Sequence, residues 1–393
     1  MAAPTASQPL SGIAAFGNEW AALLECASPS PDRQKLSSLL RAADWTRLLV
    51  LAEEHGVGGH VAACLGELPV DLVPVEIKQT LINRQRSRIF LTLRLTAELF
   101  CILDRFNLEG IAALVVKGPA LAMRAYGNPA MRNYGDLDLL VRQRDIRRAT
   151  ELMIAVGYMP SVSLRAIDAG KIPGQYLFSK PDSKLLVELH NDCTLRYFPR
   201  RLPLDEFFGR QILVPLDARE APALSVEDEL VLICIHGTKH FWERLMWVAD
   251  VAALISRQTG IDWYRVADSA RAVGAERMLH TGLRLATVLL KAKLPSEVLA
   301  AVQADRVAGR LALQTCQWLP AAGYAPHGLI ERALFRMHMR GGLIAAPAYL
   351  LRLTFLPTEE DWEDGAHRKG NWFIEAARRP FRLARKHSRD GKT

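Results

Sequence analysis

Residues 136–141 constrain the fold of this chain most, because they combine a strand pattern with two acidic side chains. The segment reads Asp-Leu-Asp-Leu-Leu-Val, and successive side chains of a strand point to opposite faces of a sheet. Asp136 and Asp138 therefore share one face, with Cα atoms roughly 6.6 Å apart at ~3.3 Å of rise per residue. Both carboxylates can then reach one divalent cation or a cation pair. The segment predicts a strand carrying a magnesium site, although such a pair is also common on a solvated edge strand.

A strand, a turn and a helix are predicted just before that segment. Residues 111–116 form a short apolar run, and Lys117, Gly118 and Pro119 follow it. Gly118 permits a tight turn, and Pro119 suits the first position of a helix. Such a turn aims free backbone N–H groups and the positive end of a helix dipole at one point. Lys117 and Gly118 are therefore candidates for binding a phosphate, with a surface lysine at a turn as the alternative for Lys117.

Another strand is predicted at residues 184–190, where Glu188 and His190 share a face. Glu188 is a candidate for a third carboxylate of the site. His190 is interpreted as a packed or solvated strand residue and not as a ligand. Arg132, just upstream of the acidic strand, is interpreted either as a phosphate contact or as a partner of Asp136 or Asp138 when metal is absent.

The order of these motifs resembles an uncharacterised family of polymerase-beta-like nucleotidyltransferases. The likeness extends beyond the strands, from Trp45 and His55 near the start to Arg379-Pro380 near the end. Enzymes of that superfamily hold divalent metal with two carboxylates from one strand and a third from a neighbouring strand. They move a nucleoside monophosphate from a nucleoside triphosphate to an acceptor.

The resemblance implies that Asp136, Asp138 and Glu188 are catalytic and hold Mg²⁺ or Mn²⁺, with a nucleoside triphosphate such as ATP as substrate. One departure concerns the turn after the first strand, which is usually Gly-Ser in that superfamily and is Lys117-Gly118 here. Lys117 is expected to replace the missing hydroxyl as a point charge on a phosphate. The acceptor, whether a small molecule, a peptide or a protein, has no readable signature.

A helix with two histidines follows the predicted sheet. Ser225 and the acidic residue three positions later form a capping signature, and His236 and His240 lie further along at i and i+4. That spacing is compatible with metal, but Gly237 follows His236, so the glutamate of the zinc-protease signature is absent. The resemblance makes Lys239, His236 and His240 candidates for triphosphate contact. The alternative is that the histidines face the sheet and Lys239 is solvated.

Together with the resemblance, these patterns predict an α+β fold, in which a small mixed β-sheet nucleotidyltransferase core is flanked by N-terminal and C-terminal helical domains. Helical periodicity is clearest at residues 45–55, 77–103 and 145–156. The predicted boundaries are an N-terminal helical region at 1–104, a catalytic core at 105–215, a C-terminal helical domain at 216–356, and a connector with a basic tail at 357–393.

The composition excludes a disordered or fibrous chain, since 50% of the residues are hydrophobic and 23% charged. The net charge of +8 comes mainly from the tail, which is expected to be a solvated terminus more than a site for RNA, anionic lipid or an acidic partner. Six scattered cysteines and the lack of a secretory signal predict a cytoplasmic protein, and the apolar residues 341–356 are too few for a transmembrane segment. The basic residues of the tail are Arg378, Arg379, Arg382, Arg385, Lys386, Arg389 and Lys392.

Two other functions are compatible with the sequence. One is a catalytically inactive nucleotidyltransferase fold that binds a partner or senses a nucleotide, but three converging carboxylates repel one another without a catalytic reason to be kept. The other is a phosphotransferase, which the lack of a His-Arg-Asp catalytic loop and of a Gly-rich Walker loop disfavours. The sequence also leads us to expect that replacing Asp138 by Asn leaves the melting temperature nearly unchanged in metal-free buffer.

Overall fold

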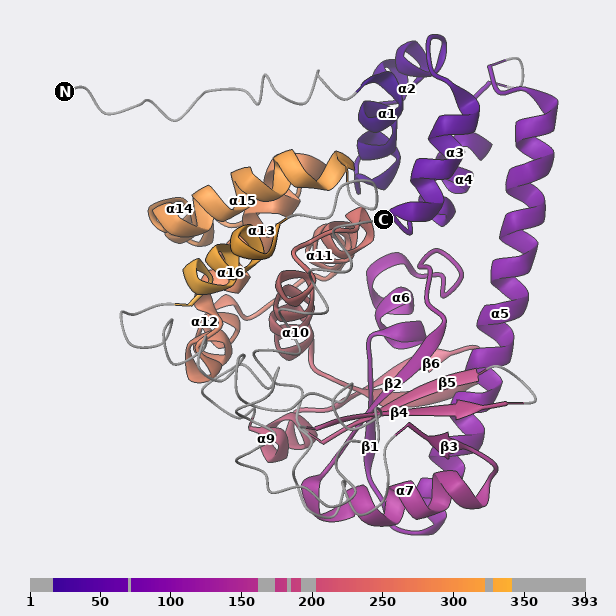
Figure 1. Cartoon of the computed structure of the whole chain (residues 1–393), viewed down its shortest axis with the longest axis vertical. Helices are drawn as coiled ribbons and strands as arrows, with labels where there is room; N and C mark the ends of the chain where they lie inside the picture. The colour runs from indigo at the N-terminus through magenta and orange to yellow at the C-terminus, as the bar shows by residue number, and fades with distance from the viewer. Residues whose placement is uncertain are drawn as a thin grey trace.

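The computed structural model describes residues 17–69, 72–161, 174–181, 185–191, 203–321 and 328–340. Its centre is a seven-stranded mixed sheet, which occupies the lower part of the molecule in Figure 1 with helices above it. The prediction of a mixed sheet flanked by helices is confirmed. The strands are β1 (Ala113–Val116), β2 (Asp136–Val141), β3 (Met159–Pro160), β4 (Gln175–Lys180), β5 (Leu185–His190), β6 (Ile212–Leu216) and β7 (Arg219–Ala223), in the order β3-β4-β5-β2-β1-β7-β6.

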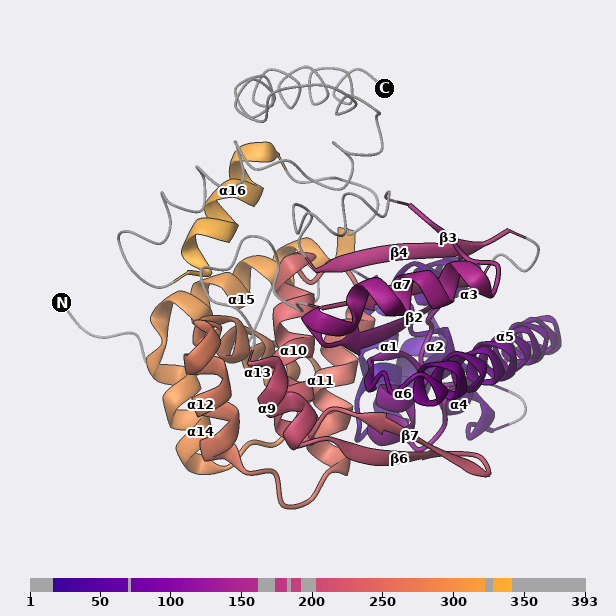
Figure 2. The same ribbon diagram turned by 90° about the horizontal axis from the view of Figure 1, so that it is seen from below.

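The helices precede the sheet region, lie within it and follow it along the chain. The first group comprises α1 (Gly17–Ala27), α2 (Arg33–Leu40), α3 (Trp45–Glu54), α4 (Gly58–Gly66) and the long α5 (Val75–Leu108). Within the sheet region lie α6 (Gly118–Tyr126), α7 (Ile146–Ala155) and α9 (Leu204–Gly209). The last group comprises α10 (Val226–Lys239), α11 (Leu245–Arg257), α12 (Trp263–Val273), α13 (Glu276–Leu290), α14 (Ser296–Ala304), α15 (Arg306–Trp318) and α16 (Leu329–His338), which lie beside the sheet in Figure 2.

The strand register brings the predicted site residues together. β2 is parallel to β5 with Asp138 opposite Glu188, and it is antiparallel to β1 with Val116 opposite Asp138. Lys117, the residue after Val116, therefore emerges beside Asp138. Side chains alternate across the sheet, so Asp136, Asp138 and Glu188 share one face. Three segments distant in sequence thus meet at one point of the sheet.

The two faces of the sheet pack against different helices. Side chains of one face, including Val115, Leu137 and Val187, form a core with the second half of α5 and with α7. On the opposite face, Val116 and Leu140 belong to a second core that also contains residues of α10 and α11. The acidic residues alternate with the first set, so they face the α10–α11 side.

The second core joins the two ends of the described chain. Trp20 of α1 and Leu48 of α3 belong to the same continuous cluster of buried side chains as Leu254 of α11 and Leu283 of α13. The N-terminal helices therefore pack on the last group of helices, and their position bears on the site described below. None of the described helices is both long and apolar enough to cross a membrane. The predicted apolar segment at 341–356 and the basic tail lie outside the described residues.

The turn between α10 and α11 is strained. α10 begins as predicted, with Ser225 Oγ accepting a hydrogen bond from the backbone N–H of Asp228 at 3.2 Å. After its last residue, Phe241 and Trp242 both adopt positive φ, at 55° and 56°. Such values are costly for bulky residues and persist only where packing imposes them. The packing comes from Trp242, which is fully buried and donates its indole N–H to Thr238 Oγ1 at 3.2 Å.

Replacing Gly237 by Ala is expected to destabilise the protein, because an added Cβ would lie 2.5 Å from ring atoms of Trp242. The ring cannot move without disturbing the strained turn, so we expect a loss of about 1–3 kcal/mol of unfolding free energy. Urea denaturation followed by circular dichroism measures it. Gly66→Ala is the matched control, since its Cβ would meet nothing within 4 Å. Equal midpoints for Gly237→Ala and the wild type would contradict this account of the turn.

Candidate active site

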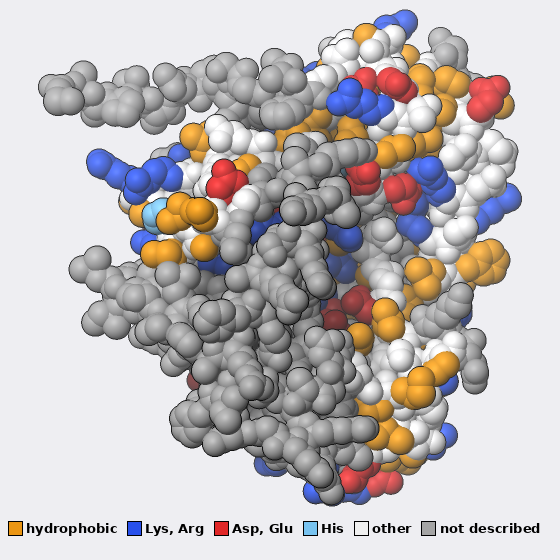
Figure 3. Space-filling model, viewed as in Figure 1, with side chains coloured by type: hydrophobic (Ala, Val, Ile, Leu, Met, Phe, Trp, Pro, Cys, Tyr) orange, Lys and Arg blue, Asp and Glu red, His pale blue; other side chains and the backbone are white. Residues whose placement is uncertain are grey.

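A cavity of about 800 Å³ lies between the acidic face of the sheet and the α10–α11 turn. On the face shown in Figure 3, acidic side chains lie in a recess near the middle of the molecule, close to Lys and Arg side chains. Gly118 is buried and is not among the lining residues. The other predicted site residues all line the cavity: Lys117, Arg132, Asp136, Asp138, Glu188, His236, Lys239 and His240.

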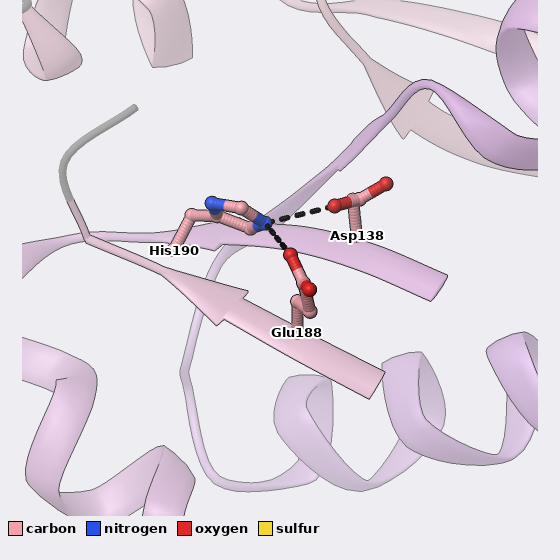
Figure 4. Close-up of side chains that lie close together, drawn as sticks. All are labelled: Asp138, Glu188 and His190. Atoms are coloured by element: carbon pink, nitrogen blue, oxygen red, sulfur yellow. Dashed lines mark hydrogen bonds and ion pairs between the residues drawn. The ribbon is translucent and has the colours of Figure 1, made fainter. Parts of the chain in front are cut away.

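Asp138 is the centre of a buried group of charges. Its Oδ1 lies 2.9 Å from His190 Nε2, and its Oδ2 lies 3.1 Å from Lys117 Nζ. His190 Nε2 is also 3.4 Å from Glu188 Oε2, so the imidazole sits between two carboxylates, as Figure 4 shows. One possible ligand atom from each of Asp138, Glu188 and His190 lies within 4.8 Å of the others. His190 is therefore part of the site, whereas the sequence suggested only a packed or solvated strand residue.

The charge states in this group follow from burial and from the close contacts. Burial by itself raises the pKa of Asp138, but the charge of Lys117 and the hydrogen bond with His190 outweigh it and hold the pKa well below its usual range. Burial lowers the pKa of His190, yet its bonds to Asp138 and Glu188 raise it overall. Lys117 behaves in the same way, because Asp138 and Glu188 more than offset the effect of burial on its pKa. Asp138 is thus held in its ionised form by Lys117 and His190, and it favours the charged form of each.

Asp136 differs from Asp138. Its side chain is half-buried and makes no hydrogen bond or ion pair within the part of the chain that the structure describes. Burial raises the pKa of Asp136, and the negative charge of Asp138 raises it further, while Lys117 opposes both. Asp136 is two residues before Asp138 on β2, and it does not belong to the group of possible ligands formed by Asp138, Glu188 and His190. Asp136 therefore lines the cavity without an ion-pair partner among the described residues.

These residues fit a hard divalent cation. Mg²⁺ and Mn²⁺ prefer carboxylate oxygens, which Asp136, Asp138 and Glu188 present on one face of the sheet. Burial raises the pKa of Asp136, and the negative charges of Asp138 and Glu188 raise it further, so a bound cation would stabilise its ionised form. Asp138 already accepts from Lys117 and His190, but a carboxylate has roughly four lone-pair positions and retains capacity for a further contact.

The basic residues of the cavity are held by partners that the sequence interpretation did not foresee. Arg132 Nε lies 2.9 Å from Asp250 Oδ2 of α11, and Asp250 also accepts from Tyr126 OH at 2.9 Å. The expectation that Arg132 pairs with Asp136 or Asp138 is therefore wrong, because the buried Asp250 carboxylate is its closer partner. Lys239 Nζ donates to Gln175 Oε1 at 3.3 Å, so it is not merely solvated.

Gln175 of β4 joins the basic and acidic sides of the cavity. Its side-chain amide donates to Glu188 while its amide oxygen accepts from Lys239. The sequence offered no signal for this residue, because its partners come from β5 and α10. A chain of polar contacts thus runs from Lys239 through Gln175 and Glu188 to His190 and on to Asp138.

The backbone of Lys117 is strained. It has φ 62° and ψ −138°, a region that non-glycine residues rarely adopt, and Gly118 follows with φ 48°. Gly118 therefore supports the turn as predicted, although it does not reach the cavity. Strain of this kind at a cavity wall points to a functional constraint on where the Lys117 ammonium group lies.

The two histidines at the end of α10 lie in the cavity as neutral rings. Burial, together with the charges of Lys117 and Lys239, lowers the pKa of His236 well below its usual range and that of His240 to about 3. Their rings lie 4.7 Å apart and contact the ring of Trp247, with centroids 5.4 and 5.2 Å away. As neutral rings, the two imidazoles add no positive charge to the cavity, and any contact with a triphosphate would be through an imidazole N–H.

The N-terminal helices hold the α10–α11 turn from outside. His55, buried directly after α3, accepts the backbone N–H of Leu245 on Nδ1 at 3.3 Å, and its carbonyl accepts the N–H of Met246 at 3.0 Å. Burial lowers the pKa of His55 to about 4, which leaves Nδ1 free to accept. The neighbouring Glu54 lines the cavity. The N-terminal helices therefore contribute to the wall of the site.

The comparison with known families agrees with this geometry. A family model described as uncharacterised nucleotidyltransferase matches residues 41–291, a span that holds every predicted site residue as well as His55, His190 and Trp247. No curated protein matches the chain. The match covers well over half of the sequence and indicates transferase activity. The chain belongs to the uncharacterised nucleotidyltransferase family.

Proposed function

We propose that this protein is a metal-dependent nucleotidyltransferase, which moves a nucleoside monophosphate from a nucleoside triphosphate to a hydroxyl of an acceptor and releases pyrophosphate. The observation that carries the proposal is the meeting of Asp136, Asp138 and Glu188 with Lys117 and Lys239 in one cavity. Carboxylates suited to a divalent cation thus lie beside side chains suited to phosphate. The cavity of about 800 Å³ falls within the about 300–1,000 Å³ typical of small-molecule sites.

Each residue has a proposed role. Asp136, Asp138 and Glu188 would hold Mg²⁺ or Mn²⁺, which when bound offsets the charge that grows on the leaving pyrophosphate. Lys117 and Lys239 bind and orient the triphosphate, and Arg132, fixed by Asp250, adds positive charge at the same wall. His190 holds the Asp138 carboxylate in place.

The reaction exchanges one phosphorus–oxygen bond for another. The acceptor oxygen forms a bond to the α-phosphorus, and the bond from that phosphorus to the bridging oxygen of pyrophosphate breaks. Asp136 takes the proton of the acceptor hydroxyl, because it is the carboxylate of the three without an ion-pair partner among the described residues. We assign selection of the acceptor to the helices that line the cavity away from the carboxylates, which belong to the proposed N-terminal and C-terminal helical domains.

Product analysis tests the proposed function. The full-length protein is incubated with Mg²⁺, each of the four common nucleoside triphosphates and a panel of alcohols, sugars and hydroxyl-bearing peptides. Mass spectrometry then follows the acceptors and the protein itself. We expect pyrophosphate together with an acceptor heavier by one nucleoside monophosphate. Nucleoside diphosphate would indicate a phosphotransferase, and Mg²⁺-indifferent nucleotide binding without turnover would indicate a sensor; either result contradicts the proposal.

A further inference from the structure

Three aromatic rings form a continuous patch on the helical wall of the cavity. His236 comes from α10, His240 directly follows α10, and Trp247 comes from α11; every pair of these rings has centroids between 4.7 and 5.4 Å apart. We call these three residues the aromatic shelf. All three side chains are half-buried and line the cavity, so part of their ring surface remains accessible to a ligand. The shelf has no role in the phosphate and metal chemistry described above.

The shelf is held rigidly. The strained turn at Phe241 and Trp242 joins its two helices, and Trp242 is locked against Gly237 and Gly282. From the other side, His55 accepts the backbone N–H of Leu245, two residues before Trp247. The three rings are tilted by 35° to 88° relative to one another, so a flat ligand can stack on one of them while the other two contact its edge. A preorganised surface loses little entropy when it binds a ligand. The strained turn and the contacts of His55 thus fix the aromatic shelf in place at the wall of the cavity.

The position of the shelf favours a ligand that also has an anionic end. Lys117 and Lys239 line the same cavity as the shelf, and Lys239 lies on α10 between His236 and His240. Burial lowers the pKa values of both imidazoles, and the nearby charges of Lys117 and Lys239 contribute to the same shift. The shelf is therefore neutral and next to the phosphate-binding side chains. A nucleotide combines the two chemistries, since its phosphates are anionic and its base is a flat ring.

We propose that the aromatic shelf stacks on the base of the nucleoside triphosphate, with Trp247 as the main contact. The proposal rests on the proposed function and adds where the base lies and which residues recognise it. Stacking tolerates every base, because each has a π-face. Glu54 and Arg244, which line the same cavity, offer an acceptor and a donor to the edge of a stacked base.

Calorimetric titration with ligands that have or lack a base tests whether the aromatic shelf binds the base. The full-length protein is titrated in Mg²⁺ with ATP, with CTP and with inorganic tripolyphosphate, which has the charge but no ring. One stacked base corresponds to a gain of roughly 5- to 150-fold in affinity. We expect both nucleotides to bind tighter than tripolyphosphate by about that factor. We expect Trp247→Leu to remove most of the difference without changing the affinity for tripolyphosphate, and Trp247→Phe, which keeps a ring, to retain most of it.

The other outcomes are distinguishable. Equal affinities of the wild type for ATP and tripolyphosphate would contradict the proposed stacking of the shelf on the base, but would not contradict the proposed function. A Trp247→Leu protein that loses tripolyphosphate binding as well would show that Trp247 supports the cavity instead of the base, which also overturns the shelf. Absence of binding by any of these ligands, together with absence of turnover, would overturn the proposed function itself. His240→Leu, at the end of the other helix, repeats the test if Trp247→Leu does not fold.

Discussion

Replacing Asp136 by Asn is expected to lower nucleotide transfer by at least about 10²–10³-fold while leaving the protein as stable as the wild type or more stable. The activity falls because the variant loses both a proposed metal ligand and the proposed proton acceptor. Stability does not fall, because the carboxylate makes no hydrogen bond or ion pair within the described residues and is repelled by Asp138. Initial rates of pyrophosphate release and urea denaturation measure the two effects.

The effect of Asp136→Asn on the free energy of unfolding should depend on pH. The pKa of Asp136 is raised in the folded protein, so its ionised form costs stability above that pKa and costs nothing below the ordinary carboxyl pKa. Any gain of stability in Asp136→Asn should therefore appear at neutral pH and vanish as the pH falls. Asp205→Asn, at a side chain 91% exposed, is the matched control and should change neither activity nor stability appreciably. Full activity of Asp136→Asn would remove Asp136 from the reaction.

Asp138→Asn is expected to lose both activity and stability. Asp138 is 3% exposed and holds Lys117 and His190 as partners, so its replacement leaves the buried Lys117 ammonium group without its closest counter-charge. Removing one partner of a buried ion pair typically costs about 3–5 kcal/mol. The structure thus reverses the expectation from sequence that the melting temperature stays nearly unchanged. Urea denaturation at neutral pH in metal-free buffer measures the loss.

The loss should depend on pH and on Lys117. The pKa of Asp138 is lowered in the folded protein, so its contribution is present above the ordinary carboxyl pKa and fades only as the pH falls through the lower folded value. His190 has a raised pKa, so its part of the pairing fades as the pH rises through that value. The double variant Lys117→Met/Asp138→Asn should lose less stability than the two single losses added together. Additive losses would show that the Lys117–Asp138 contact contributes nothing.

The strands, and the carboxylates on them, could be read from local patterns. The alternation in residues 136–141 predicted β2 and the shared face of Asp136 and Asp138, and the apolar run with Gly118 predicted β1 followed by α6. The cap at Ser225 and the helix at 145–156 were likewise correct within a residue or two. Such signals depend on neighbours within a few positions, which is why they survive without knowledge of the fold.

The partners of the charged residues could not be read in this way. Arg132 pairs with Asp250, 118 positions away, and the contacts of the strand residue His190 with Asp138 and Glu188 raise its pKa despite its burial. His55 signalled nothing by itself, since its role depends on Leu245 of another helix. Trp247 lies beside two imidazoles because the α10–α11 turn brings two helices together, which no local pattern of residues indicates. Each of these roles is set by a contact between distant segments.

The amino-acid sequence by itself determined the acidic strand, the turn at Lys117 and the family, because strand periodicity and turn chemistry are written in consecutive residues. Tertiary structure alone decided which cation balances each carboxylate, that Asp136 is left unbalanced, and that two histidines are neutral rings beside a tryptophan. The physical reason is that charge states depend on burial and on groups within a few ångströms, and both are properties of the packed chain.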